Sequence, residues 1–418
     1  MKRWRLSIGI SLVLVLVASL TGSLLVTGCA PGAGTEEPTP TEEPGKEVYH
    51  LVMETIYPPR DPGTDMLGVA CYTWIDDLAA ASDGRIQIDF YAANQLVPMT
   101  EAFVALAGEG TMDLLFAGSY WSGMMPEQDW GLMAFINAGE DYVVHLYDET
   151  DFGKLYEEGC NEVNVHHVFP ATVGGEVFWS TKPLYSLEDL KGVLCCPASQ
   201  GHNWCYEAAG MVPVPIVGAE IYTGLQRGTI DAVLYPQYSG WKFHYDEVTD
   251  YILQPPWHDP IEIMTWMNLD KYNNMPDDLR DIFDEVNHEY KTYILPNGAK
   301  HFAAMSYFWN EQLGMETIYW PQDEVDKLRN IMIEKAWPEW GAQSPRCQQM
   351  MEIAIETMRN WKNVNPEAWE EYTTRFSSDE AYKAWATERC DPEYLKEWKA
   401  KYIAPDYQGP PENWEPLS

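Results

Sequence analysis

The sequence predicts an α/β protein of two lobes, and three observations lead to this prediction. The chain has 418 residues, which is too long for one ordinary core and long enough for two domains. Strand-like and helix-like segments alternate along its first part, a pattern typical of sheets that contain parallel strands covered by helices. A unit of helix, glycine and strand occurs twice, which indicates two related halves that face a shared cleft.

The composition is that of a folded and strongly acidic protein. Hydrophobic residues make up 46% of the chain and charged residues 22%, so a packed core is expected. The net charge is −37; without the first 28 residues, which hold three of the 27 bases, 24 basic residues face 64 acidic ones and the charge is −40. Such a surface repels phosphate backbones, which excludes nucleic acid as a partner, and it repels anionic lipid.

The first 28 residues have the pattern of a secretory signal peptide. Three basic residues precede an apolar run from about residue 6 to residue 26, and two small residues then stand before Cys29. A single membrane-spanning helix is the alternative, but serine, threonine and glycine interrupt the run. Residues 29–47 are rich in proline, glutamate and threonine and predict an extended tether, so the folded part begins near Val48.

The cysteine that follows the small residues resembles the lipobox of bacterial lipoproteins. This resemblance implies that Cys29 is lipidated and becomes the N-terminus of an exported protein anchored to a bacterial membrane. No second stretch of about 18 apolar residues follows it in the sequence.

Five elements in order predict the first lobe. An apolar run at 48–56 ended by two prolines predicts a strand, and apolar residues at helical spacing predict a helix over 64–82. Alternating apolar residues then predict a strand over 85–91. A short helix over 100–107, closed by glycines, precedes a buried strand over 112–117.

The last part of this series recurs later in the chain. Residues 110–116, Gly-Thr-Met-Asp-Leu-Leu-Phe, have a counterpart in residues 228–234, Gly-Thr-Ile-Asp-Ala-Val-Leu. Each copy follows a short amphipathic helix and leads into a loop with aromatic residues, Tyr120 and Trp121 in one case and Tyr235 in the other. Open α/β sheets bind ligands at the carboxyl ends of their strands, so both loops are expected at one cleft.

The remaining chain predicts two crossings between the lobes. The boundary falls near residues 171–175, and a strand over 263–268 returns the chain to the first lobe. Residues 276–312 predict one or two long helices, interrupted near Pro296, that span both lobes as part of a hinge. The expected organisation is a signal peptide over 1–28, a tether over 29–47, lobe 1 over 48–172 plus about 262–300, lobe 2 over 173–261 plus about 301–340, and a helical C-terminal extension over 341–418.

Motifs in the predicted second lobe resemble one family of receptors. Residues 184–192, Leu-Tyr-Ser-Leu-Glu-Asp-Leu-Lys-Gly, and residues 220–231, Glu-Ile-Tyr-Thr-Gly-Leu-Gln-Arg-Gly-Thr-Ile-Asp, are similar to stretches of the DctP-type solute receptors of TRAP transporters. The resemblance covers roughly residues 48–335. It implies a two-lobed periplasmic-binding-protein-like fold of type II-like architecture, with a mixed sheet flanked by helices in each lobe and a long interlobe helix.

The resemblance also implies a function. Such a receptor captures a small organic solute between its lobes and delivers it to a membrane permease driven by an ion gradient, with no cofactor and no catalysis. Two further stretches, 120–126 and 256–260, are similar to the branch of the family associated with keto acids and other small organic acids.

The sequence departs from the family at the position that grips the ligand. The family's carboxylate-binding arginine falls on Cys196, and its upstream basic position falls near Glu176. A bidentate arginine–carboxylate contact consists of two charge-assisted hydrogen bonds, and a thiol cannot replace them. We therefore expect that Arg60, Lys182 or backbone amides take this role, or that the ligand is neutral, aromatic or cationic.

The candidate binding residues are mostly aromatic. Of the two acids that hold a metal ion in one branch of the family, Asp259 is present and the other falls on Leu234, so no metal is expected. Glu176 and Asp259 are expected to orient hydroxyls or an amine, and for each aromatic residue packing in the core is the alternative. The expected ligand-binding residues are Tyr57, Tyr120, Trp121, Glu176, Trp179, Cys196, Tyr235, Trp257 and Asp259.

Seven cysteines remain after Cys29, an odd number, and an exported protein permits disulfides. Cys347 and Cys390 are one expected pair, whereas Cys195 and Cys196 are expected on opposite faces of one strand. The C-terminal extension predicts helices near residues 347–361 and 380–402, packed on the second lobe or reaching into a partner chain as a homodimer.

Two other functions compete with the receptor. An exported, hydrolase-like enzyme would use Glu176 and Asp259 as paired carboxylates, but no nucleophile elbow or metal motif is visible in the sequence. A solute sensor without transport is the third interpretation.

Overall fold

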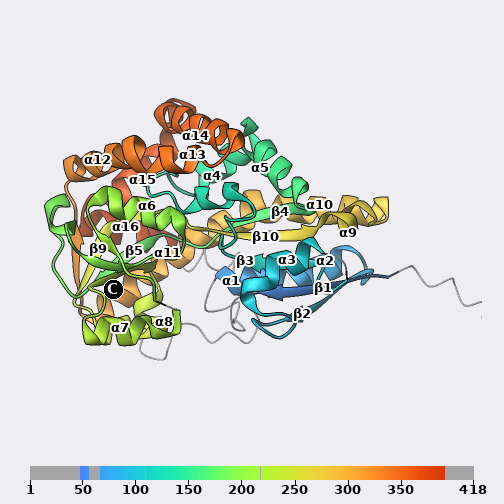
Figure 1. Ribbon diagram of the computed structural model, residues 1–418, viewed down its shortest axis with the longest axis horizontal. Coiled ribbons are helices and arrows are strands. Elements are labelled where there is room, and N and C mark those ends of the chain that lie inside the picture. Colours follow the sequence, from blue (N-terminus) through green and yellow to red (C-terminus); the bar gives the residue numbers. More distant parts are fainter. Residues whose placement is uncertain (1–47, 56–65, 109, 217, 391–418) are drawn as a thin grey trace, which may run out of the picture. The chain divides into compact units, whose positions relative to one another are not determined.

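The computed structural model describes residues 48–55, 66–108, 110–216 and 218–390, and two mixed sheets organise this part of the chain (Figure 1). The first sheet has the strand order β2-β1-β3-β10-β4, and the second has the order β7-β6-β8-β5-β9-β11. In both sheets three neighbouring strands are parallel, and the next strand, β10 in the first sheet and β5 in the second, runs antiparallel to them. The predicted mixed sheets are thus confirmed.

The first sheet contains the three strands predicted over 48–56, 85–91 and 112–117. Strand β1 (Tyr49–Thr55) pairs in parallel with β2 (Ile86–Tyr91) and with β3 (Leu114–Ala117). Strand β10 (Glu262–Asn268) runs antiparallel between β3 and β4 (Val165–Thr172). Because β10 lies far along the chain, the first sheet is completed only after the second sheet has begun, as the predicted crossing requires.

The second sheet repeats this arrangement. Strands β6 (Leu194–Cys196) and β7 (Val212–Pro213) lie parallel, and β8 (Ala232–Pro236) pairs with β6. The antiparallel neighbours come next: β5 (Glu176–Ser180), β9 (Tyr251–His258) and then β11 (Glu316–Tyr319), which is parallel to β9.

The repeated Gly-Thr-x-Asp unit has the same structural role in both sheets. Gly110 and Gly228 both have positive φ, at 85° and 69°, a conformation that glycine adopts without the steric cost of a Cβ. In each copy the aspartate accepts a hydrogen bond from the backbone N–H of the adjacent parallel strand: Asp113 from Val52 at 2.9 Å, and Asp231 from Leu194 at 3.1 Å. The repeat therefore fixes the start of β3 and β8 against their neighbours.

Helices follow most strands and cover the sheets (Figure 1). The helix predicted over 64–82 is observed as α1 (Met66–Gly68), one π-helical turn (Val69–Thr73) and α2 (Trp74–Ala81). The other helices of the sheet-forming part are α3 (Ala102–Ala107), α4 (Glu140–Asp148), α5 (Asp151–Glu162), α6 (Gln200–Ala209), α7 (Ile221–Arg227), α8 (Ser239–Phe243), α9 (Leu269–Asn273), α12 (Gln322–Ile331) and α13 (Trp337–Gly341).

The long helix predicted over 276–312 is present, with the expected interruption. It consists of α10 (Asp277–Glu289), a π-helical turn (Tyr290–Ile294) and α11 (Leu295–Leu313). Pro296 stands directly after the π-helical turn, and proline lacks the N–H that a regular α-helix needs at an interior position. The widened turn absorbs this defect, so the helix continues through it.

Three further helices form the predicted C-terminal extension: α14 (Pro345–Val364), α15 (Pro366–Arg375) and α16 (Asp379–Arg389). The apolar stripe of α14 is buried within the chain, where the Tyr142 hydroxyl donates to Ala354 O at 3.0 Å and the Tyr142 and Trp361 rings meet edge to face. Helix α14 packs on α4 and α5, and α16 packs on α11. The prediction that this extension packs on the second lobe is therefore wrong for α14, since α4 and α5 precede β4 of the first sheet.

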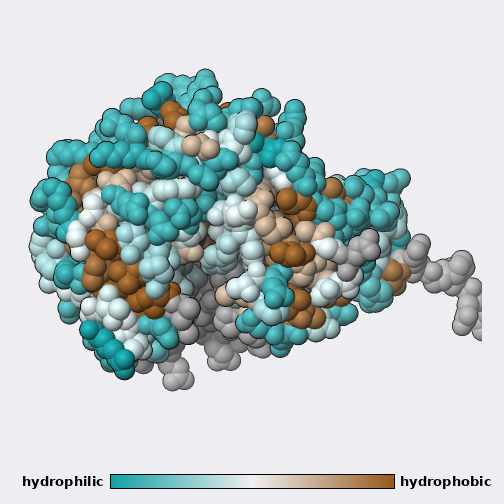
Figure 2. Space-filling model, in the orientation of Figure 1, coloured by the Kyte–Doolittle hydropathy of each residue, from teal (hydrophilic) through white to brown (hydrophobic). Residues whose placement is uncertain are grey.

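The surface over α12 and α14 is mostly hydrophilic on the face seen in Figure 2. This agrees with an apolar stripe turned inward. Among the described residues, no helix is long and apolar enough to cross a membrane.

The buried thiols correct one prediction. Cys347 is a free, buried thiol, so the expected disulfide to Cys390 is not formed. Burial raises the pKa of the Cys347 thiol to about 12, which keeps it protonated and unreactive. Cys195 and Cys196 belong to two different core clusters, as expected for neighbours on one strand.

Candidate functional site

A cavity of about 520 Å³ lies where the carboxyl ends of β3 and β8 meet the strands that connect the two sheets. A volume of this order is typical of small-molecule sites. Its lining is mostly apolar and aromatic and consists of Leu67, Gly118, Ser119, Tyr120, Leu132, Val173, Glu176, Ala198, Gly218, Tyr222, Leu234, Tyr235, Pro236, Tyr238, Phe243, Tyr245, Ile261, Glu262 and Ile263.

The two aromatic loops of the repeated unit meet at this cavity. Tyr120 follows β3, whereas Tyr235 and Tyr238 belong to the end of β8 and the turn after it. The expectation that both loops reach one cleft is met by this geometry.

Gly118 sets the position of the Tyr120 ring. A Cβ at Gly118 would lie 2.8 Å from Cζ of Tyr120, closer than van der Waals contact permits. The ring therefore folds back over the backbone of the loop, with 45% of the residue exposed. A side chain at position 118 would force the ring to move.

Three aromatic residues form one wall of the cavity. The rings of Tyr235, Phe243 and Tyr245 lie with centroids 5.7, 5.7 and 5.8 Å apart, which is the usual range for interacting aromatic pairs. They come from β8, from α8 and from the short turn after α8. Such a wall presents π faces and ring edges to a ligand.

Glu176, the first residue of β5, also lines the cavity and lies beside two histidines. Its Oε2 lies 3.1 Å from His258 Nδ1 and 3.9 Å from His202 Nε2, and all three residues are buried. Burial raises the pKa of the Glu176 carboxyl above its ordinary value, and the His258 hydrogen bond offsets part of this rise. Burial also lowers the pKa of His202 well below its ordinary value, and the nearby His258 adds to this, so the His202 ring is neutral at pH 7.

These three side chains offer one ligand atom each within 4.8 Å of one another, which is a spacing that a metal ion could bridge. The hydrogen bonding of His202 argues against it. The Ala198 N–H donates to His202 Nδ1 at 3.1 Å, so the ring proton is on Nε2, the atom that a metal would need unprotonated. The cluster therefore fits a hydrogen-bonded carboxyl better than a metal centre.

A second acid, Glu262 at the start of β10, also lines the cavity. Its Oε1 accepts a hydrogen bond from Asn137 Nδ2 at 2.8 Å, and Asn137 is itself held by Pro260 O at 2.7 Å. Burial raises the pKa of the Glu262 carboxyl well above its ordinary value, the Glu176 charge adds to this, and the Asn137 hydrogen bond counters it. Glu262 and Glu176 thus form an acidic pair of neighbours at the cavity.

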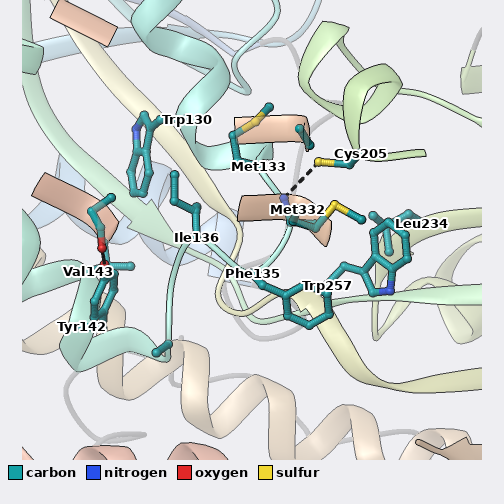
Figure 3. Packing of buried hydrophobic residues seen from close by; sticks show 14 of the residues in the cluster. Trp130, Met133, Phe135, Ile136, Tyr142, Val143, Cys205, Leu234, Trp257 and Met332 are labelled. Atoms are coloured by element: carbon teal, nitrogen blue, oxygen red, sulfur yellow. Dashed lines mark hydrogen bonds between the residues drawn. The ribbon is translucent and has the colours of Figure 1, made fainter. Parts of the chain in front are cut away.

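Three of the expected tryptophan residues lie in the core and do not line the cavity. Trp257 packs against Phe178 and Phe135 with ring centroids 4.8 and 6.1 Å away, next to Leu234 (Figure 3). Trp179 is fully buried, and Trp121 stacks on Phe103 at 5.6 Å. For these three residues the structure favours the alternative of core packing.

Asp259 and Cys196 also point to structural roles. The Asp259 carboxylate pairs with the Arg375 guanidinium of α15, whose other nitrogen lies 3.7 Å from Glu140, and all three residues are buried. Cys196 donates its S–H toward Ile216 O at 3.3 Å and belongs to an apolar cluster beside the cavity. Tyr57 and Arg60 lie outside the described residues, as does Cys29, and Lys182 pairs with Asp231 at 2.8 Å, away from the cavity.

Several residues of the site were missed in the sequence. Glu262 had a visible signal, because it is the one acid at the head of an otherwise apolar run, Ile-Met-Thr-Trp-Met, in a predicted buried strand. His258 stands between two residues that were chosen, Trp257 and Asp259. His202 and Arg375 gave no signal, since a lone histidine or arginine in a helical stretch has no distinguishing pattern.

The comparisons with known proteins identify the family. The model of the bacterial extracellular solute-binding proteins, family 7 (DctP), matches residues 62–343, more than half of the chain. The chain belongs to this family. A "Solute-binding protein" of Albidiferax ferrireducens is 22% identical over 282 residues, 66% of this chain and 82% of the relative. A "Monocarboxylate 2-oxoacid-binding periplasmic protein" of Nostoc is 25% identical over 294 residues, 63% of this chain and 77% of the relative.

Solved structures share the fold. A TRAP periplasmic solute-binding protein from Rhodoferax ferrireducens with bound malonate superposes with a TM-score of 0.67 at 19% identity, covering 75% of this chain and 99% of that one. Another, from Chromohalobacter salexigens with bound (S)-(+)-2-amino-1-propanol, gives a TM-score of 0.62 at 22% identity, covering 77% and 99%. The protein is therefore an extracellular solute-binding protein with the two-lobed fold of this family.

Proposed function

We propose that this protein is a lipid-anchored receptor that closes its two lobes on one small organic solute and delivers it to a TRAP membrane permease driven by an ion gradient. The observation that carries the proposal is the cavity of about 520 Å³ at the carboxyl ends of β3 and β8. Family membership and the lipobox-like Cys29 support the same function.

The connections between the sheets support a hinge. Residues 173–175 lead from β4 to β5, and residues 259–261 lead from β9 back to β10. A Cβ at Gly175 would lie 2.7 Å from Asp259 Oδ1, so the two connections approach each other closely. We place the lobe boundaries here, with lobe 1 over 48–172 plus about 262–300 and lobe 2 over 173–261 plus about 301–340.

Saturable binding without turnover tests the receptor function. A ligand that binds only the folded protein stabilises it and raises the melting temperature. When the free ligand concentration is 100 times Kd, the free energy of unfolding rises by about 2.7 kcal/mol. A thermal-shift screen over acids, alcohols and amines finds such ligands, and chromatography of the mixture after incubation shows whether they are converted. Conversion at catalytic rates would support the exported enzyme instead, although Asp259, one of the two carboxylates expected for it, pairs with Arg375.

The anchor and the delivery step need separate tests. Mass spectrometry of the native protein is expected to show a diacylated Cys29, and Cys29→Ser is expected to leave the precursor unprocessed. Release of the mature protein without lipid would refute the anchor and leave the receptor function intact. Uptake of the bound solute in cells is expected to be lost when either this gene or the permease genes are deleted.

A further inference from the structure

The charges around the cavity are unbalanced. In the described part of the chain, the residues that line the cavity include two carboxylic acids, Glu176 and Glu262, and no lysine, arginine or histidine. Glu262 is 2% exposed, and its Oε2 has no hydrogen-bond partner among the described residues. A buried carboxylate without a counter-charge is costly, so this arrangement favours a ligand that supplies one.

Asn137 and His258 are the hydrogen-bond partners of the two acids. Asn137 binds Glu262 through an amide, and its own oxygen is engaged by the Asp259 N–H at 3.2 Å. Glu176 faces two imidazoles, of which His202 is held as the Nε2–H tautomer by the Ala198 N–H. The Asn137 amide and the His258 ring therefore orient the two carboxyls, and neither residue lines the cavity.

Two buried cations of the described chain, Arg375 and Lys300, are paired with other carboxylates. Arg375 is shared by Asp259 and Glu140 in a buried cluster, and Lys300 pairs with Asp141 at 2.8 Å. Moving Arg375 to the cavity would leave the buried Asp259 carboxylate without its partner, which is strongly destabilising.

The aromatic wall of the cavity also favours a cationic ligand. The Tyr235, Phe243 and Tyr245 rings line the cavity as a contiguous group, and Tyr120, Tyr222 and Tyr238 add further rings. An aromatic face attracts a cation, and the attraction is stronger where the cation is desolvated. A cavity with acids and aromatic faces is thus suited to an amine.

We propose that the solute of this receptor is a small organic cation that carries a primary or secondary ammonium group, and that Glu262 and Glu176 determine this specificity. The proposal rests on the proposed function, since it assigns the ligand class of the same cavity. The ammonium N–H groups donate to the two carboxylates, and the remainder of the ligand packs on the tyrosine and phenylalanine rings. A carboxylate ligand would instead place a third acid beside Glu262 and Glu176, with no lysine, arginine or histidine among the described lining residues.

Matched triplets of probes test the ligand class. Each triplet is an amine, an alcohol and a carboxylate on one carbon skeleton, for example benzylamine, benzyl alcohol and benzoate, with aliphatic series of three to eight carbons. Thermal shift in an amine-free buffer selects the triplets that bind, and calorimetry then measures each member. The amine is expected to bind at least tenfold more tightly than its alcohol or its carboxylate.

Isosteric variants test the assigned residues. Glu262→Gln and Glu176→Gln are each expected to weaken amine binding at least tenfold and to change alcohol binding less than threefold. Glu188→Gln, an exposed acid away from the cavity, removes the same charge and is expected to change nothing. Circular dichroism and the melting temperature confirm that each variant is folded, and either cavity variant suffices if the other fails to fold.

The opposite results separate this inference from the function on which it rests. A carboxylate that binds tenfold more tightly than its amine overturns the ligand class and leaves the receptor intact, and Arg60→Gln then tests whether Arg60 supplies the cation. Amine binding that survives both cavity variants overturns the assignment of Glu262 and Glu176. Failure of every probe of all three charge types counts against the solute receptor itself.

Discussion

Arg375 offers the sharpest test of how the C-terminal extension stabilises the fold. Its guanidinium is 2% exposed and lies between Asp259, which is 1% exposed, and Glu140, which is also 1% exposed. It also stacks over the Phe376 ring at 4.4 Å. Replacing Arg375 with Met keeps much of the packing volume, leaves the buried Asp259 carboxylate without its ion-pair partner, and removes one of the two cations near Glu140.

The cost follows from these contacts. Breaking a buried ion pair by removing one partner costs about 3–5 kcal/mol, and the lost cation–π contact adds about 0.5–2 kcal/mol. We therefore expect Arg375→Met to lower the free energy of unfolding by about 4 kcal/mol, measured by urea titration with tryptophan fluorescence. The double variant with Asp259→Asn is expected to recover at least 1 kcal/mol of this loss, because the uncompensated charge is then reduced.

Arg280→Met is the matched control. Arg280 pairs with Asp277, whose side chain is 89% exposed, and exposed pairs contribute about 0–1 kcal/mol. A loss below 1 kcal/mol for Arg375→Met, or a loss equal to that of the control, would refute the view that this buried cluster attaches α15 to the connection between the sheets.

Three further predictions follow from the site. Because burial raises the pKa of the Glu262 carboxyl in the folded protein, this carboxyl keeps its proton to a higher pH there than in the unfolded chain. Glu262 therefore lowers the free energy of unfolding as the pH rises above about 4.5. Glu262→Gln should therefore gain stability relative to wild type from pH 5 to pH 8 in thermal melts; a constant difference would contradict this. Gly240→Ala should cost about 1–3 kcal/mol, since its Cβ would lie 2.4 Å from the Trp179 ring, whereas Gly123→Ala meets nothing within 4 Å and should be neutral. Cys196→Arg should lower stability by more than 2 kcal/mol without creating acid binding, because Cys196 lies in an apolar cluster; tight benzoate binding by this variant would contradict it.

The fold was largely predictable because its signals are local. An apolar run ended by prolines indicates β1, alternation of apolar residues indicates β2, and the repeated Gly-Thr-x-Asp unit indicates β3 and β8, where the aspartate side chain binds the neighbouring strand. The packing of α14 was not predictable in this way. An apolar stripe indicates that one face of a helix is buried, but it does not indicate which elements pack against that face.

The candidate site was only half predictable, and the reason lies in what the aromatic residues share. Tyr120 and Tyr235 line the cavity and Trp179 and Trp257 lie in the core, yet all four occupy strands or strand ends. A strand places alternate residues on opposite faces, and in a sheet covered on both sides each face is equally apolar, so periodicity cannot tell a cavity wall from a core.

Charge is the more informative signal in such a sheet. An acid within a buried strand must be paired or exposed to a ligand, and no apolar packing explains it. Asp259 and Glu262, three residues apart, show the two outcomes: the first meets Arg375 from a helix more than a hundred residues away, and the second faces the cavity with an amide as its described partner. The sequence therefore indicates that both acids are unusual, but only the fold shows that Asp259 is paired and that Glu262 faces the cavity. The Asp259→Asn and Glu262→Gln variants measure this difference.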